Sequence, residues 1–177
     1  TYTVKAINIM TGCFAIRQIT ITNNIVTPVV TAAVDQNVTS CNVSNGQVSA
    51  NVAGATAGFN FYWFNGNPAG TDSVAATFKG AIWSGRPVGT YTVVAVNKAT
   101  RCVSAKRTVS VADNTVLPVI SASTVNQTSC NALAPNGQAS ADVAGVTAGY
   151  KFRWFAGADT TSFITQASTL TNRPAGT

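Results

Sequence analysis

The chain has 177 residues with no histidine and no glutamate, and eleven Lys and Arg against five Asp give it a net charge of +6. A triad that needs histidine is therefore excluded, and the aspartates occur singly, without a partner for acid–base catalysis. We expect neither enzyme activity nor a cofactor or metal. The basic residues are scattered apart from Arg101, Lys106 and Arg107, so we expect no nucleic-acid partner. No run of 18 apolar residues is present, and we expect no membrane insertion.

The composition favours strands, because Val and Thr are abundant whereas the helix formers Glu, Lys and Leu are scarce. Short alternating segments between turn residues predict an all-β chain. In chain order, the strands predicted for one complete repeat are 29–34, 47–53, 59–65, one or two strands within 75–83, and a hairpin of 90–97 and 103–112. Six or seven short strands in about 90 residues are typical of an antiparallel, immunoglobulin-like β-sandwich.

The aromatic residues of two segments alternate with polar ones, so each segment predicts a strand with one face in the core. In segment 59–65 the core-facing residues include Phe61 and Trp63, and in its copy, which begins at Tyr150, they include Phe152 and Trp154. We expect all four to be core aromatics. Two further aromatics, Trp83 and Tyr62, lack aromatic counterparts in the copy, and we expect them to be exposed or to contact a neighbouring module.

The sequence repeats with a period of about 90 residues, which indicates tandem modules. The tetrapeptide TYTV at Thr1 returns at Thr90, and TSCN at Thr39 returns at Thr128. Pro28 and Pro118 each follow a strand-like run, where a module junction is expected. We therefore predict that residues 1–27 are the C-terminal strands of a preceding module, 28–117 a complete module and 118–177 the N-terminal part of a following one. On this interpretation the chain is a stretch of a longer protein.

The four cysteines occupy two positions of the repeat, since Cys13 corresponds to Cys102 and Cys41 to Cys130. A regular pattern of this kind favours disulfides and an oxidising compartment. We expect Cys41 to pair with Cys102, and Cys13 and Cys130 to have partners outside the segment. The alternative is a bridge from Cys41 to the last hairpin of a neighbouring module, because a plain immunoglobulin-like topology puts Cys41 and Cys102 at opposite ends of the sandwich.

The order of motifs resembles the adhesin repeats of gliding Bacteroidota, which are related to PKD and immunoglobulin-like modules. These motifs are Cys-Asn at Cys41, Asn-Gly-Gln-Val at Asn45, aromatic-x-aromatic-x-Trp ending at Trp63, Gly-Thr-Tyr-Thr-Val at Gly89, and Cys102 in the last hairpin. The resemblance covers the whole chain and implies export to the cell surface and a place in a very long adhesin or fibre. The chain departs from the family at residues 54–58, where the family often has Gly-Gly-x-x-Pro-Tyr.

Two functions follow as expectations. The first is structural: a stalk or fibre segment of a giant adhesin or filament, whose partners are neighbouring modules of the same chain or identical chains in a multi-stranded filament. The second is a repeated ligand-binding module that contacts polysaccharide or another cell surface. The two are separated by where the repeats differ, because binding gains support if the variable residues, 67–77 against 158–167, lie on one exposed surface.

Overall fold

A computed structural model describes residues 1–176, which form strands and turns and no helix. The all-β class predicted from the sequence is therefore confirmed. The chain divides into two compact units, Thr1–Thr115 and Val116–Thr177. The strands are β1 (Tyr2–Ile7), β2 (Phe14–Ile19), β3 (Val30–Gln36), β4 (Gly46–Val52), β5 (Phe59–Asn65), β6 (Phe78–Lys79), β7 (Ile82–Arg86), β8 (Gly89–Asn97), β9 (Arg107–Val111), β10 (Ile120–Val125), β11 (Gly137–Val143), β12 (Trp154–Phe155), β13 (Phe163–Thr165) and β14 (Thr169–Arg173).

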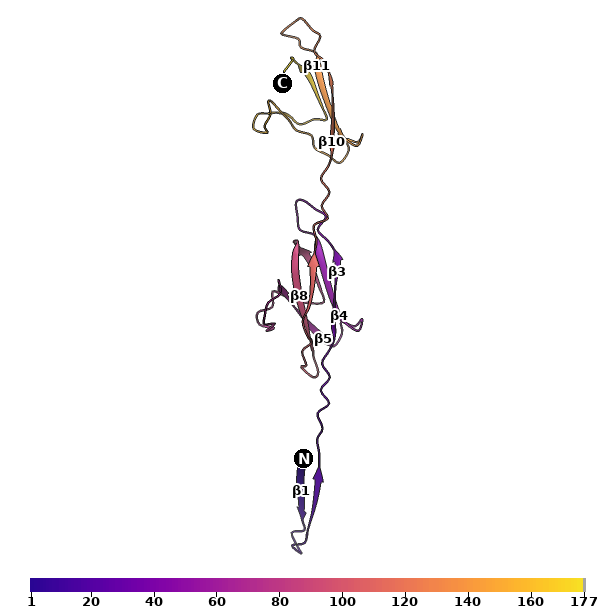
Figure 1. Cartoon of the computed structure of the whole chain (residues 1–177), viewed down its shortest axis with the longest axis vertical. Helices are drawn as coiled ribbons and strands as arrows, with labels where there is room; N and C mark the ends of the chain where they lie inside the picture. Colours follow the sequence, from indigo (N-terminus) through magenta and orange to yellow (C-terminus); the bar gives the residue numbers. More distant parts are fainter. Residues whose placement is uncertain (177) are drawn as a thin grey trace. The chain divides into compact units, whose positions relative to one another are not determined.

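Strands β3 to β9 form two sheets, and we call this part the middle module (Figure 1). One sheet has the order β3-β4-β7 and the other the order β6-β5-β8-β9, with every pair antiparallel. The two sheets also meet at their edges, where Val38 and Asp113 form a parallel bridge. Strand β5 begins and ends where the sequence predicted it. The region predicted as one or two strands, 75–83, contains β6 and the first two residues of β7.

The core of the middle module lies between the two sheets. Alternate residues of β4 and β5 point inward, and Val48, Phe61 and Trp63 are almost completely buried. Strand β8 contributes Tyr91 and Val93 from the four-stranded sheet. Because both sheets supply this cluster, the module has the sandwich-like character that the alternating pattern predicted.

The backbone conformation or close packing of the middle module explains why glycine stands at two positions, 54 and 46. Ala53 and Gly54 both have positive φ, at 49° and 80°, as the primed turn that ends β4 requires. Gly46 lies at the start of β4, where a Cβ atom would meet the carbonyl oxygen of Arg86 at 2.6 Å and a methyl of Val111 at 2.7 Å. A side chain at this position would therefore push the two sheets apart.

Strands β1 and β2 form an antiparallel hairpin that begins the chain, and neither strand pairs with another strand in the described residues. Its register places Tyr2 opposite Ile19 and Val4 opposite Arg17. All twelve strand residues are exposed. The hairpin is therefore a strand pair whose apolar side chains are not covered.

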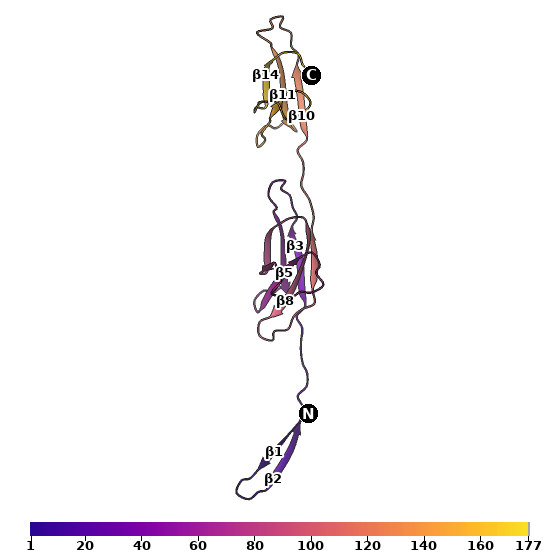
Figure 2. The same ribbon diagram turned by 90° about the vertical axis from the view of Figure 1, so that its left-hand side faces the viewer.

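The second unit repeats the three-stranded sheet of the middle module with the order β10-β11-β14, as Figure 2 shows. Ile120 lies opposite Val143 as Val30 lies opposite Val52 in the middle module. The other sheet is reduced to the short pair β12-β13. The copy of β5, which was predicted to begin at Tyr150, is a strand only at Trp154 and Phe155. None of the described residues forms a helix long and apolar enough to cross a bilayer.

Candidate interaction surface

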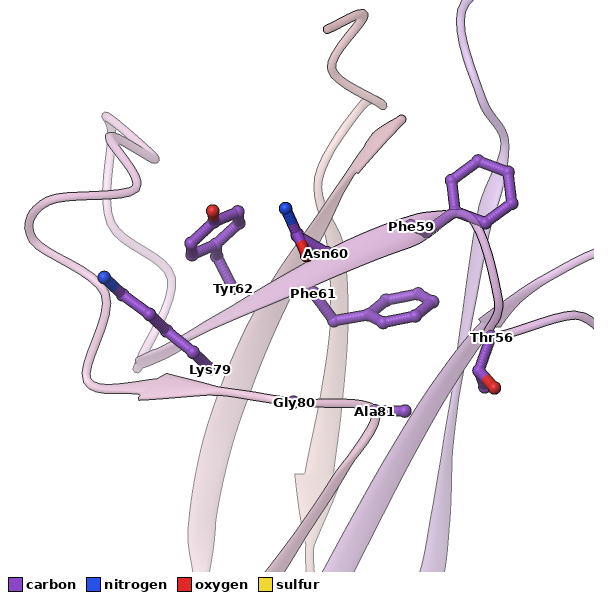
Figure 3. A pocket seen from close by; sticks show the side chains of 8 residues that line it. All are labelled: Thr56, Phe59, Asn60, Phe61, Tyr62, Lys79, Gly80 and Ala81. Carbon is purple, nitrogen blue, oxygen red and sulfur yellow. The ribbon is translucent and has the colours of Figure 1, made fainter. Parts of the chain in front are cut away.

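The outward face of the four-stranded sheet presents an aromatic residue beside a lysine. Asn60 and Tyr62 alternate with the core residues of β5 and point away from the core. Strand β6 places Lys79 directly opposite Tyr62, with its Nζ atom 5.7 Å from the centre of the Tyr62 ring. Figure 3 shows Asn60, Tyr62 and the end of Lys79 on the same side of β5. This cation–π contact holds a ring and an amine together at the surface.

A shallow groove of about 410 Å³ follows the junction of β5 and β6 (Figure 3). Its lining residues are Thr56, Phe59, Asn60, Phe61, Tyr62, Lys79, Gly80 and Ala81. Aromatic rings beside an amide and an amine can stack on a flat polar ligand and form hydrogen bonds to it. The groove thus has the chemistry of a weak binding site for a neutral or anionic polymer.

The loop between β5 and β6, residues 66–77, borders a second groove of about 280 Å³ on the same outward face. Tyr62 lines this groove too, together with Asp72, Val94 and Arg101. The loop is attached to the sheet at its start, where the Thr92 hydroxyl donates to the Gly66 carbonyl at 2.6 Å. Further on, the amine of Lys106 donates to the carbonyl of Pro68 at 3.0 Å. The two grooves share Tyr62, and we call the two grooves and the loop together the outer surface.

Residues of the outer surface differ between the repeats. In the second unit Arg153 occupies the place of Tyr62, and its Nε lies 3.5 Å from Oε1 of Gln166, which occupies the place of Lys79. The variable loop 67–77 borders the second groove, which Tyr62 also lines, whereas Lys79 lines the first groove. The core contact nearby is retained, because the indole N–H of Trp63 donates to the Gly80 carbonyl and that of Trp154 donates to the Ala167 carbonyl. The exposed pair and the loop therefore both differ between the repeats, while this core hydrogen bond is kept.

The four aromatics expected in the core have different surroundings in the two units. Phe61 and Trp63 are 3% and 0% exposed in the middle module. Phe152 and Trp154 are half-buried in the second unit. The lower burial follows from the second unit's shorter sheet, which has no counterpart of β8 and β9 in the described residues.

The prediction that Trp83 is exposed or contacts another module is wrong. Trp83 is 5% exposed and stacks on Phe78 at a centroid distance of 5.3 Å. Tyr91 meets it edge-on at 5.3 Å, and the guanidinium of Arg86 lies 4.2 Å from its ring. In the second unit Leu170 occupies the place of Trp83. Leu170 lies opposite Ala139, just as Trp83 lies opposite Val48 in the middle module. The apolar character of both residues was the signal for a core position.

All four cysteines are free thiols in the structure. Cys41 lies in the loop after β3, and hydrogen bonds between Thr39 and Asn45 close the base of this loop. The Asn45 side-chain oxygen accepts from the Thr39 N–H at 2.9 Å, and the Asn45 amide donates to the Thr39 hydroxyl at 2.8 Å. These bonds hold the loop in a closed form after the end of β3.

The predicted disulfide between Cys41 and Cys102 is therefore not formed. The parallel bridge between Val38 and Asp113 places the loop of Cys41 beyond the end of β9, whereas Cys102 precedes the start of β9. Residues 102–113 would span roughly 30 Å as a strand, and a disulfide requires Cα atoms within about 7 Å of each other. The hydrogen bonds between Thr39 and Asn45 keep Cys41 at this end of the sandwich. The bridge to a neighbouring module stays a prediction.

The titratable groups are dispersed over the surface. In the part of the chain that the structure describes, no three His, Cys, Asp or Glu side chains lie close enough to share a metal ion. Hydrogen bonds from Thr115 lower the pKa of the Asp113 carboxyl, and those from Thr161 lower the pKa of Asp159. Burial raises the pKa of the Tyr91 hydroxyl, with the Arg86 charge opposing the rise.

Comparison of the chain with family models and with curated proteins finds no match.

Proposed function

We propose that the chain is a structural repeat segment, a stalk or fibre, of a giant bacterial adhesin or filament that is exported to the cell surface. We assign it no enzyme activity. Support comes from the repeat, because the core contacts of Trp63 and Trp154 recur while the outer surface changes. A protein whose modules are selected for packing and connection is expected to keep its core and to vary its surface.

The immunoglobulin-like topology belongs to this proposal, and three features support it. The two sheets have three and four strands, with the last hairpin β8–β9 on the four-stranded sheet. The Tyr91 hydroxyl at the start of β8 donates to the carbonyl of Pro87, four residues upstream, at 2.8 Å. A tyrosine in this position, bonded in this way, is typical of immunoglobulin-like sandwiches. The first and last strands also meet in parallel at Val38 and Asp113.

The observation that carries the load-bearing role is this parallel junction. The N–H of Val38 donates to the Ala112 carbonyl at 3.0 Å, and the N–H of Asn114 donates to the Val38 carbonyl at 2.7 Å. The side chain of Asn37 adds a third bond by accepting from the Ala112 N–H at 2.9 Å. Tension on the two ends of the module pulls parallel neighbours in opposite directions, so these hydrogen bonds are loaded together in shear.

Single-molecule force spectroscopy of the full chain tests this role. We expect one dominant force peak, with an extension gain of about 250 Å as the middle module unfolds. Asn37→Ala should lower the peak force, because it removes one of the bonds that share the load. The matched control is Asn51→Ala, which removes turn and cross-strand bonds away from the junction and should leave the peak force nearly unchanged. Extension of the chain without a peak would contradict the proposal.

The alternative function is a repeated ligand-binding module that contacts polysaccharide or another cell surface. It is favoured by one observation, that the groove beside the variable loop is also lined by Tyr62, which is replaced by Arg153 in the second unit. A glycan array probed with the full chain tests it, with Tyr62→Ala expected to lose binding and Ser110→Ala on β9 as the control. Equal binding by the two variants, or no binding by the folded protein, would contradict this alternative. The structural role would then be the only function proposed.

A further inference from the structure

The second groove, of about 280 Å³, lies on the outward face of the four-stranded sheet of the middle module. It is lined by Val94 of β8, which is 1% exposed and lies directly opposite Tyr62, whose ring points outward (Figure 3). The loop 66–77 contributes residues 71–73, which carry two hydroxyls and one carboxylate, and the β8–β9 turn contributes Arg101. An aromatic ring, hydrogen-bonding groups and a guanidinium therefore meet in one groove.

Arg101 has a backbone conformation that residues with a side chain rarely adopt. Its φ is 61°, and the equivalent residue of the β1–β2 turn is Gly12, with a φ of 72°. The two turns share their closing hydrogen bond. The N–H of Arg101 donates to the Asn97 carbonyl at 2.9 Å. In the same way, the N–H of Gly12 donates to the Asn8 carbonyl at 2.7 Å. The middle module thus has an arginine, at a cost in backbone strain, where glycine fits without strain. Strained residues of this kind are concentrated at functional sites.

Positive charge is concentrated on this sheet of the middle module. The four strands and the loops between them, 59–79 and 89–111, contain five Lys and Arg against a single Asp. The three-stranded sheet and its loops, 30–58 and 80–88, contain one Asp and one Arg. The five basic residues are Lys79, Lys98, Arg101, Lys106 and Arg107. The surplus of positive charge attracts an anionic ligand to the four-stranded sheet rather than to the other one.

The repeats keep a positive charge on the outward side of the aromatic segment while the residues that carry it change. In the second unit Lys151 occupies the place of Asn60 and Arg153 that of Tyr62. Gln166 occupies the place of Lys79, so the basic residue of the short neighbouring strand is lost. A ligand that is recognised chiefly by its negative charge tolerates such exchanges, because the charge matters more than its exact position.

The groups in the second groove fit an acidic sugar. A guanidinium forms paired hydrogen bonds with a carboxylate, which gives both direction and strength. The Tyr62 ring offers a flat apolar surface for the face of a sugar ring. The hydroxyls of residues 71 and 73 can donate to and accept from sugar hydroxyls, and the Asp72 carboxylate can accept from them. A nucleic acid fits less well, because its phosphates call for a dense stripe of basic residues.

We infer that the second groove binds an acidic polysaccharide. The Arg101 guanidinium pairs with a sugar carboxylate, and Tyr62 stacks on the sugar ring. This inference deepens the ligand-binding alternative, on which it rests, by naming the class of ligand and the residue that selects it. The structural role of the chain does not depend on it.

An NMR titration of the full chain with tetragalacturonic acid tests the inference, because the amides of Asp72 and Val94 report on the groove itself. We expect their signals to shift with the acid, and the neutral methyl ester of the same oligosaccharide to bind about tenfold more weakly. Arg101→Gly should weaken binding of the acid by about the same factor. This variant should remain folded, because glycine occupies the equivalent place in the β1–β2 turn.

Lys98→Ala is the matched control, since it removes the same charge from the same turn at an exposed residue that lines neither groove. It should leave the affinity for the acid nearly unchanged. Equal weakening by Lys98→Ala and Arg101→Gly, or equally tight binding of a single-stranded DNA, would overturn the inference, because general attraction of polyanions would explain the binding.

Two other outcomes separate this inference from the ligand-binding alternative. Binding of the neutral ester as tightly as the acid would overturn the inference and leave the alternative standing. No shift with either oligosaccharide would also overturn the inference, and the glycan array would then decide whether the alternative fails with it.

Discussion

The middle module and the second unit carry closely similar motifs, and they differ in one hairpin. In the middle module β8–β9 completes the sandwich, and β5 is a seven-residue strand. In the second unit the same aromatic motif forms only the two-residue strand β12, and Ile120 is exposed where Val30 is buried. The difference teaches that the aromatic motif needs a partner strand from later in the chain before it forms a complete strand.

Truncating the central tryptophan should give the largest difference in stability loss between the two units. Trp63→Ala removes a side chain that is fully buried between the sheets, at an expected loss of about 3–5 kcal/mol in the free energy of unfolding of the middle module. Trp154→Ala should cost less than half as much, because Trp154 is half-buried. Hydrogen exchange of the β4 and β11 amides, measured by mass spectrometry, reports the two units separately. Equal losses would contradict the comparison.

The paired positions Val30 and Ile120 give the next largest effect. Val30→Ala should destabilise the middle module by about 2 kcal/mol, since it removes buried methyl groups and leaves a cavity. Ile120→Ala should change the stability of the second unit by no more than about 0.5 kcal/mol, as is usual at exposed sites. Urea unfolding at a protein concentration where the chain is monomeric measures both. A large effect at Ile120 would mean that this face of the second unit's sheet is covered within one chain.

The glycines at the start of β4 and β11 allow the packing of the two units to be compared at equivalent positions. A Cβ at Gly46 would meet both the Arg86 carbonyl and Val111 of β9, whereas a Cβ at Gly137 would approach the Arg173 carbonyl and the side chain of Gln127. We expect Gly46→Ala to cost about 1–3 kcal/mol, because both sheets must shift. Gly137→Ala should cost less, since its second contact, with the Cβ atom of Gln127, is at 3.3 Å, whereas the contact with Val111 at Gly46 is at 2.7 Å. Thermal unfolding of the two variants checks this order.

The asparagine that closes the loop after the first strand should have equal effects in the two units. Asn45 bonds both the N–H and the hydroxyl of Thr39, and Asn136 does the same with Thr128. Because the same two hydrogen bonds close both loops, Asn45→Ala and Asn136→Ala should each cost about 1 kcal/mol. Hydrogen exchange of the two loops measures this. A clear difference would show that the last hairpin stabilises the loop as well as the core.

Alkaline pH should give the smallest effect and should act on the middle module alone. Burial raises the pKa of Tyr91, so the folded state favours the neutral hydroxyl. The stabilisation is complete below the ordinary tyrosine pKa of about 10 and declines as the pH rises above it. Unfolding curves at several alkaline pH values should show this decline for the wild type. Tyr91→Phe should reduce this decline in stability. If the variant showed the same decline as the wild type, other titratable groups would be its cause.

Much of the middle module could be predicted from local patterns. The alternation in Phe59–Asn65 defined β5 and its inward residues, and the bounds of β4 and β8 were predicted to within one residue. Trp83 was misplaced because the irregular segment before it hid the register of β7. The outer surface was found only in part, since the contact between Tyr62 and Lys79 depends on how β6 pairs with β5.

The sequence by itself determined the all-β class, the repeat period and the core-facing residues of β5, because these follow from alternation and self-similarity along the chain. Only the tertiary structure decided that Trp83 is buried, that the closed loop keeps Cys41 from Cys102, and that Ile120 is exposed where Val30 is buried. The physical reason is that burial and strand formation in a sandwich depend on partners distant in sequence, and the motif of the second unit shows what remains when that partner is missing.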